Sequence, residues 1–261
     1  MKVSRYYVLN RNHALILLIV LFLFSAAVVA LAGSIPAAWA AITSNPQEKR
    51  VIRCTDRSQG VVSLTFDAYS SDENIRDVCR ILAQHDVKAT FFVTGSWASK
   101  YPESLELLHK NGHKIMNSSD SFSGLASLSK AKIMEKINRC SDIIQAVTGE
   151  RPDYFRAPDG EYNDKVFEAL AELKMLPIGW DVDSLDDDGM DDEGIVKRVT
   201  SLAVSGSIIK MSVDGDETVD ALPDIITGLR AKGYQFITIP EMVYTENYRI
   251  NIQGRQVYMG D

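Results

Sequence analysis

Apolar and polar positions follow two different periods along residues 61–239. Seven short runs are dense in apolar, β-branched or aromatic residues, as is typical of buried strands; they cover 61–67, 87–95, 114–118, 154–157, 176–183, 207–213 and 234–239. Six amphipathic stretches with helical spacing lie between them, near 72–84, 101–111, 127–147, 163–174, 192–204 and 217–232. This alternation predicts an α/β fold with a parallel sheet, either closed into a barrel or open and doubly wound.

A longer apolar run near the N-terminus predicts a membrane anchor. Residues 14–32 are uncharged and almost wholly apolar, and as a helix they would reach roughly the thickness of a bilayer core. Three cations and no acids precede them, so residues 1–13 are expected in the cytoplasm and the rest of the chain outside. Residues 38–40 have the A-x-A form of a signal-peptide cleavage site, but a secretory apolar region is usually only about 7–15 residues long. We expect a retained single-pass anchor in the cell membrane, and a secreted protein if the chain is cleaved after Ala40.

The rest of the chain divides into a linker, one domain and a tail. Residues 33–57 carry two prolines without clear periodicity and are expected to form a linker. The folded domain is expected over 58–245, and a loosely packed or unpacked C-terminal tail over 246–261. The odd number of cysteines, three, excludes a complete disulfide framework. Cys79 and Cys140 lie on the apolar faces of predicted helices, where buried, inert thiols are expected.

The charge of the chain limits the partners it can bind electrostatically. The net charge is −7, and residues 1–32 contribute three cations and no acids, so the remainder carries −10. Such a surface argues against nucleic acid and anionic wall polymers as partners. A neutral glycan is compatible with it.

Four segments in a fixed order carry the candidate chemistry: Leu64-Thr65-Phe66-Asp67-Ala68, residues 112–122, Phe155-Arg156-Ala157-Pro158-Asp159-Gly160, and residues 206–213. In a parallel barrel, functional side chains gather at the C-terminal ends of the strands, where these segments end. Together they resemble the polysaccharide deacetylases, the NodB-homology family or carbohydrate esterase family 4. The resemblance covers 58–245 and implies a distorted seven-stranded (β/α) barrel of the NodB-homology type, preceded here by one transmembrane helix.

The metal-ligand positions that the resemblance implies are Ala68, Ser118 and Phe122. The family uses a divalent metal such as zinc, held by an aspartate at the first position and histidines at the other two. None of the three residues present is a competent zinc ligand, because a methyl and a phenyl group have no donor atom and a hydroxyl is a weak one. No metal site and no cofactor are therefore predicted.

Other positions of the family pattern are kept. By resemblance, Asp67 is the general base, Arg156 holds it in place, and the backbone N–H of Asp159 faces the developing oxyanion, in a groove that includes Pro158 and Gly160. Alternatively, Arg156 is only a buried counter-ion of Asp67.

Two further segments complete the comparison with the family. Asp183, at an orienting position, belongs to a matching segment with Ser184 and Asp186, whereas Asp187 replaces a tryptophan that lines the acetyl pocket in the family. The general acid histidine is replaced by Ser212, which does not titrate near neutral pH.

The four histidines of the chain are His13, His85, His109 and His113, and none lies at the C-terminal end of a predicted strand. For His113 we expect a surface or helix-end position.

Three functional hypotheses follow. The first is a catalytically silent family member of carbohydrate metabolism, a pseudoenzyme that binds or scaffolds cell-wall glycans such as peptidoglycan containing N-acetylglucosamine. The second is an active metal-dependent N-deacetylase, a hydrolase of carbon–nitrogen bonds, with Asp67, Asp120 and Asp183 around a hard cation. The third is a signalling or assembly protein that uses the barrel as a rigid block. Membrane-tethered relatives suggest, by analogy, envelope or sporulation biology in a Gram-positive bacterium; protein partners are not predicted.

Overall fold

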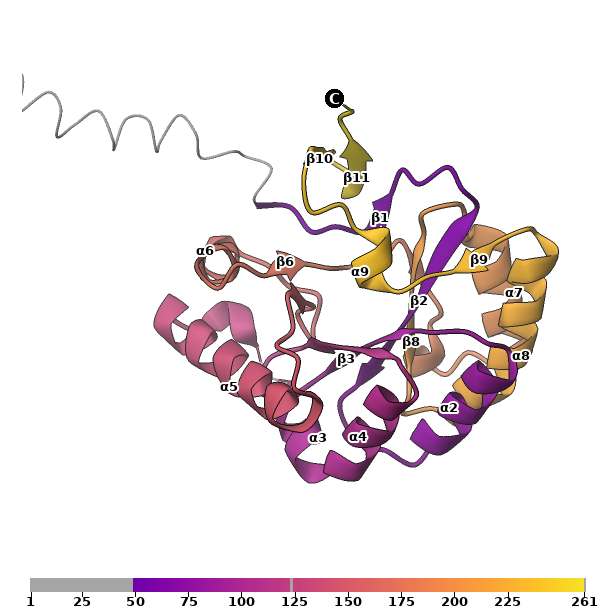
Figure 1. Ribbon diagram of the computed structural model, residues 1–261, viewed down its shortest axis with the longest axis horizontal. Coiled ribbons are helices and arrows are strands. Elements are labelled where there is room, and N and C mark those ends of the chain that lie inside the picture. The colour runs from indigo at the N-terminus through magenta and orange to yellow at the C-terminus, as the bar shows by residue number, and fades with distance from the viewer. Residues whose placement is uncertain (1–48, 123, 261) are drawn as a thin grey trace, which may run out of the picture. The chain divides into compact units, whose positions relative to one another are not determined.

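A curled parallel sheet forms the centre of the fold (Figure 1). The computed structural model describes residues 49–122 and 124–260; the expected N-terminal segment, anchor, cleavage site and most of the linker lie outside them. The strands are β1 (Cys54–Thr55), β2 (Val61–Ala68), β3 (Thr90–Val93), β4 (Lys114–Asn117), β5 (Tyr154–Phe155), β6 (Leu176–Pro177), β7 (Val182–Asp183), β8 (Ile208–Ser212), β9 (Gln235–Phe236), β10 (Tyr248–Ile250) and β11 (Arg255–Tyr258). Seven of them run side by side in the order β6-β5-β4-β3-β2-β8-β7, and β9 pairs with β2.

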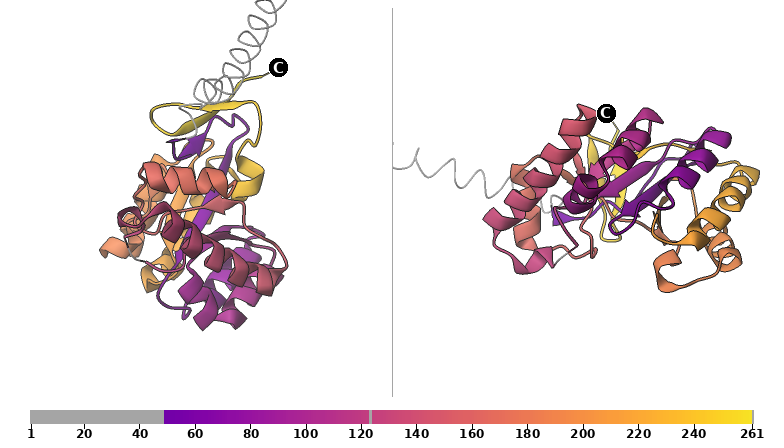
Figure 2. Two further views of the ribbon diagram at one scale, coloured as in Figure 1. Left: turned by 90° about the vertical axis from the view of Figure 1, so that its left-hand side faces the viewer. Right: turned by 90° about the horizontal axis from the view of Figure 1, so that it is seen from below.

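Helices cover the outer face of this sheet (Figure 2). They are α2 (Ile75–Gln84), α3 (Gly95–Lys100), α4 (Pro102–Lys110), α5 (Lys130–Thr148), α6 (Asp164–Glu172), α7 (Asp192–Leu202), α8 (Asp216–Ala231) and α9 (Ile239–Met242), with 3-10 turns η2 (Leu125–Ser127) and η3 (Asp186–Asp188). All six predicted helices are present, and α3 and α9 are additional. Among the described helices, none is long and apolar enough to span a membrane.

The predicted α/β fold with a seven-stranded parallel sheet is confirmed, but the sheet curls into a half-barrel. The run 176–183 was expected to be one strand and forms two, β6 and β7, with Gly179 and Trp180 between them. Instead of direct pairing of β6 with β7, the segment before β2 bridges this side of the fold: Ile52 pairs with Ile178, and Cys54 with Ser207.

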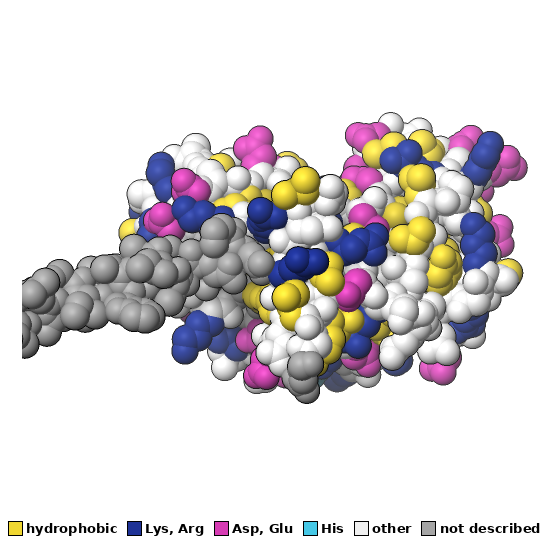
Figure 3. All heavy atoms as spheres, turned by 90° about the horizontal axis from the view of Figure 1, so that it is seen from above, with side chains coloured by type: hydrophobic (Ala, Val, Ile, Leu, Met, Phe, Trp, Pro, Cys, Tyr) yellow, Lys and Arg dark blue, Asp and Glu magenta, His cyan; other side chains and the backbone are white. Residues whose placement is uncertain are grey.

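The expected loose tail over 246–261 is wrong for the part that the structure describes. Strands β10 and β11 form a hairpin, and β11 pairs in parallel with β1, making a small three-stranded sheet. Ile250 is buried in a core cluster with Ile52 and Ile178, so the hairpin packs on the domain. Figure 3 views the face that carries this small sheet, where charged and apolar side chains are interspersed.

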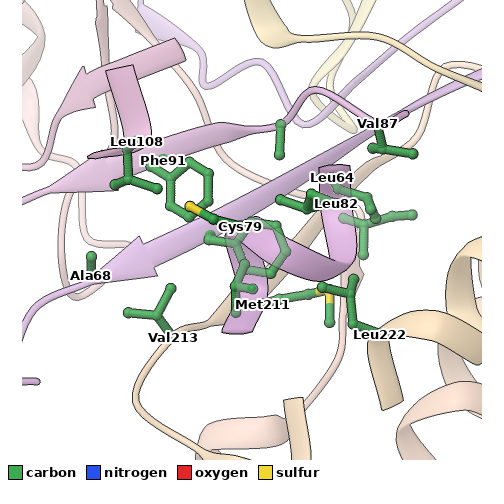
Figure 4. Packing of buried hydrophobic residues seen from close by; sticks show 14 of the residues in the cluster. Leu64, Ala68, Cys79, Leu82, Val87, Phe91, Leu108, Met211, Val213 and Leu222 are labelled. Atoms are coloured by element: carbon green, nitrogen blue, oxygen red, sulfur yellow. The ribbon is translucent and has the colours of Figure 1, made fainter. Parts of the chain in front are cut away.

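Strand β2 has one apolar face and one face with buried polar residues. Its alternate residues Val62, Leu64, Phe66 and Ala68 join the large apolar cluster beneath the helices (Figure 4), because side chains alternate between the two faces of a strand. The intervening Ser63, Thr65 and Asp67 point the other way, and all are buried. The three cysteines are free and buried, as expected for Cys79 and Cys140.

Candidate functional site

A cavity of about 390 Å³ lies at the C-terminal ends of β2 and β8, where sequence reasoning placed the functional side chains. Its walls are formed by Asp67, Tyr69, Ser70, Phe122, Pro158, Asp159, Trp180, Asp187, Lys210, Ser212 and Asp214. Five of these residues, Asp67, Phe122, Pro158, Asp159 and Ser212, were assigned to the site from the sequence. The four motifs therefore do meet at one place in the fold.

Asp67 and Arg156 form a buried ion pair beneath the cavity. The Nη1 of Arg156 donates to the Asp67 Oδ1 at 2.8 Å, and its Nη2 donates to the Thr65 hydroxyl at 2.9 Å and the Gly179 carbonyl oxygen at 3.2 Å. The guanidinium also lies 4.0 Å from the centre of the Phe92 ring. Burial raises the pKa of the Asp67 carboxyl, and the charge of Arg156 opposes that rise. The contact predicted between these two residues is present, and it suits both an orienting role and a counter-ion role.

The side chain of Tyr69 occupies the space between two of the family's metal-ligand positions. Its hydroxyl is hydrogen-bonded to that of Ser118 at 2.9 Å, and Ser118 in turn donates to the Arg156 carbonyl oxygen at 2.8 Å. The rings of Tyr69 and Phe122 pack with their centres 5.5 Å apart. The Tyr69 hydroxyl also hydrogen-bonds to Asp67, and burial raises its pKa well above the usual range. The neutral phenol of Tyr69 thus contacts Ser118, Phe122 and Asp67 at the same time.

The remaining ligand position, Ala68, does not line the cavity. It is fully buried in the apolar cluster that also contains Val213 (Figure 4). Among the described residues, no group of three or more His, Cys, Asp and Glu side chains is placed to hold a metal ion. The residues present therefore do not fit the divalent metal that the family implies.

Lys210 is the one basic side chain in the cavity wall, within the part of the chain that the structure describes. Its Nζ lies 3.4 Å from the Asp183 Oδ1 and 3.2 Å from the Asp187 Oδ2. Burial disfavours its charge, but the carboxylates of Asp183, Asp67 and Asp187 outweigh this and raise the pKa of Lys210. It is therefore a protonated cation at neutral pH and cannot act as a base.

Asp186 holds the far wall of the cavity together. Its carboxylate accepts hydrogen bonds from the Ser212 N–H at 2.7 Å, the Thr218 hydroxyl at 2.6 Å and the Ser184 hydroxyl at 2.7 Å. These bonds tie η3 to β8 and α8. Burial raises the pKa of Asp186. Ser212, at the general-acid position, presents only a hydroxyl to the cavity.

The loop after β5 forms another wall. Gly160 has a φ of 70°, and a Cβ there would lie 3.2 Å from the Trp180 ring, so the close approach of the loop to Trp180 requires glycine. The Asp159 carboxylate accepts the Glu161 N–H at 3.0 Å. Pro158 and Asp159 line the cavity as expected, and the oxyanion role of the Asp159 N–H remains a prediction.

Other residues singled out in the sequence also lie away from the cavity wall. Asp183, at the end of β7, accepts the Leu185 N–H and contacts Lys210 without lining the cavity. Asp120 faces α5, 3.3 Å from Arg139, so the proposed trio of Asp67, Asp120 and Asp183 is not assembled around one point. The prediction of a surface position for His113 is wrong, because its side chain is buried, with only 3% of the residue exposed.

Sequence reasoning did not assign Tyr69, Trp180 or Lys210 to the site. Lys210 could have been recognised from the sequence, because it is the single charged residue in a predicted strand that is mostly apolar. Tyr69 directly follows Asp67-Ala68 at a strand end, but its contacts with Ser118 and Phe122 cross about fifty residues of sequence. No local pattern reports such contacts.

Comparison with known proteins identifies the family. A protein-family model described as polysaccharide deacetylase matches residues 55–178. The chain is 32% identical to the peptidoglycan-N-acetylglucosamine deacetylase of Bacillus cereus, across 72% of this chain and 70% of that protein. It is 33% identical to the peptidoglycan-N-acetylmuramic acid deacetylase PdaC of Bacillus subtilis, but spans only 43% of that protein's length.

A solved structure points the same way. It is a mutant, with restored enzymatic activity, of a family 4 carbohydrate esterase pseudoenzyme from Bacillus anthracis. It superposes with a TM-score of 0.72 at 27% identity, covering 74% of this chain and 71% of that one. The chain belongs to the polysaccharide deacetylase family, which confirms the resemblance seen in its motifs.

Proposed function

We propose that this protein is a catalytically silent polysaccharide deacetylase that binds cell-wall glycan. The observation that carries the proposal is the position of Tyr69. Its hydroxyl bonds to Ser118 and its ring packs on Phe122, so the space between two ligand positions is filled by a side chain with no affinity for zinc. The remaining ligand position, Ala68, is buried in an apolar cluster.

The groups that remain are too few to supply the missing catalysis. A bound metal would polarise the acetyl carbonyl and activate water, contributions worth several kcal/mol of barrier. Lys210 is protonated and paired with Asp183 and Asp187, so it cannot replace the missing electrophile or act as a base. Ser212 cannot protonate a leaving amine near neutral pH. Together these contacts support binding without turnover.

The glycan part of the proposal rests on the cavity walls and on the relatives. The rings of Tyr69, Phe122 and Trp180 line the cavity and can pack against the apolar face of a sugar ring. The curated relatives reported above are named for deacetylation of peptidoglycan sugars. We propose a cell-wall glycan as the ligand, bound by a domain that residues 14–32 tether to the outer face of the membrane, in envelope or sporulation biology.

Metal content, acetate release and glycan binding, measured together on the purified full-length protein, test this. We expect no stoichiometric zinc, no acetate from N-acetylglucosamine oligomers or peptidoglycan, and sedimentation with purified cell walls. The Bacillus cereus relative, assayed in parallel, is the positive control for turnover. Stoichiometric zinc with turnover would refute the proposal.

A rearranged but active deacetylase remains the second candidate. The observation that favours it is the intact Asp67–Arg156 pair at the cavity floor, at 2.8 Å. If it is right, one of a series of divalent ions supports acetate release and Asp67→Asn abolishes it. Absence of both turnover and cell-wall binding would favour the assembly protein instead.

A further inference from the structure

The cavity carries more negative than positive charge. Four carboxylates line it, those of Asp67, Asp159, Asp187 and Asp214, against the single ammonium of Lys210. Arg156 neutralises Asp67 from below, and Lys210 is shared between Asp187 and Asp183. The surplus is therefore anionic, and it faces a concave space that concentrates its field.

Two of these carboxylates have no cationic partner among the described residues. Asp159 accepts the Glu161 N–H, and Asp214 accepts the Ser71 N–H at 2.9 Å. Each of these bonds is to a neutral donor, which fixes the carboxylate in place without cancelling its charge. They belong to different elements, the loop after β5 and the loop after β8, and both line the cavity.

We infer that the cavity recognises the free amino group of a de-N-acetylated amino sugar in preference to the acetamide of the N-acetylated sugar. This inference rests on the proposed glycan-binding function and names the class of sugar. A protonated amine forms charge-assisted hydrogen bonds with carboxylates, whereas an acetamide is neutral and gains nothing from the surplus charge. The same surplus repels a sugar that carries a carboxylate or phosphate.

The remaining walls fit the rest of such a sugar. Trp180, Tyr69 and Phe122 offer aromatic surface, and Pro158 adds an aliphatic one. Lys210 lies 5.4 Å from the centre of the Trp180 ring and holds the Asp187 carboxylate at 3.2 Å. A sugar ring stacked on the aromatic surface would present its amine to the carboxylates around it. The protein would then bind the product of a deacetylase, and the class of reaction that must supply its ligand is N-deacetylation of a wall or chitin-like glycan.

Paired titrations test the inference. Glucosamine hexamer and N-acetylglucosamine hexamer are titrated into the full-length protein by calorimetry at low salt, below the pKa of the sugar amine. We expect the glucosamine hexamer to bind about tenfold or more tightly, because surface charge pairs and charged hydrogen bonds contribute on this scale. The preference should shrink with added salt and when the pH is raised above the pKa of the amine.

Variants separate the cavity from the general charge of the protein. Asp159→Asn and Asp214→Asn should each reduce the preference about threefold to tenfold. Asp224→Asn, the same change at an exposed position of α8, should leave the preference intact. Hexalysine measures binding that comes from charge alone.

The outcomes distinguish this inference from the proposed function. Equal binding of the two hexamers would overturn the inference and leave glycan binding standing. Binding of neither would overturn both. A preference that hexalysine matches, or that Asp159→Asn and Asp214→Asn leave unchanged, would also overturn the inference.

Discussion

Three neighbouring residues, Asp67, Ala68 and Tyr69, show how the site has changed at the scale of single side chains. Asp67 keeps its ion pair with Arg156 at 2.8 Å. Ala68 faces the apolar cluster, and Tyr69 reaches across to Ser118 and Phe122. The apolar residues at 68 and 213 belong to one cluster, so each makes the other position less suitable for a charge. A carboxylate introduced at one of these positions alone would therefore be buried among apolar side chains.

Ala68→Asp tests that point. The substitution buries a carboxylate in a cluster without a partner for it, so we expect the free energy of unfolding to fall by on the order of 3 kcal/mol. Urea denaturation measures it. Ala146→Asp, the same change at an exposed position of α5, should cost under about 1 kcal/mol. A stable Ala68→Asp protein that binds zinc would show that the position is still open to a metal.

At the scale of elements, the central strands β3 and β4 are joined by a buried histidine. The turn after α4 passes through Gly112, at a φ of 78°, and places His113 beside the start of β3. The His113 Nδ1 accepts the Ala89 N–H at 3.3 Å, and its ring packs on Phe91. Because both faces of these strands are covered, the imidazole is shielded from water. His113 is therefore buried, whereas the sequence had suggested a position at the surface or at a helix end.

The burial of His113 predicts a loss of stability in acid. Burial lowers its pKa from 6.5 to about 4. The unfolded state therefore binds the proton more tightly, and the stability present above pH 6.5 is lost as the pH falls towards 4, by roughly 3 kcal/mol. Unfolding free energies measured from pH 7 to pH 4 should show this slope, and His113→Gln should remove it. An unchanged slope in that variant would assign the acid sensitivity to other groups.

Several elements were predictable from the sequence because their signal is local. The β2 run and the α5 stripe show their periods within the segment itself, and the motif at the end of β2 links that strand to the family. The split of 176–183 into β6 and β7 depends on Ile52, more than a hundred residues away, which pairs with Ile178. The same holds for Tyr69, whose role depends on partners beyond β4. Contacts made across the fold leave no period in the chain.

At the scale of the whole molecule, the domain includes segments that the sequence assigned to a linker and a tail. Residues 54–55 form β1 and pair with β11, and Arg50 donates to the Ile250 carbonyl oxygen. The fully buried Gln256 side chain bonds to both the N–H and the carbonyl oxygen of Tyr244. The small sheet is therefore part of the folded unit.

A matched pair of substitutions in the hairpin tests this. Ile250 is 6% exposed and Ile252, two residues on, is 82% exposed. Ile250→Ala should lower the free energy of unfolding by about 2 kcal/mol or more, because it leaves a cavity in the core cluster. Ile252→Ala should change it by less than about 0.5 kcal/mol. If both substitutions have equally small effects in thermal or urea unfolding, the prediction of a loosely packed tail would be supported instead.

The small sheet also has a practical consequence. Through β1 and β11, the first and last described residues leave the fold on the same side, and the cavity lies at the C-terminal end of β2, on the other side (Figure 1). A fluorophore or reporter enzyme attached beyond Tyr258 would stand clear of an incoming sugar chain. If the proposed recognition of de-N-acetylated glycan holds, the protein attached through its C-terminal end can serve as a probe for imaging such polymers.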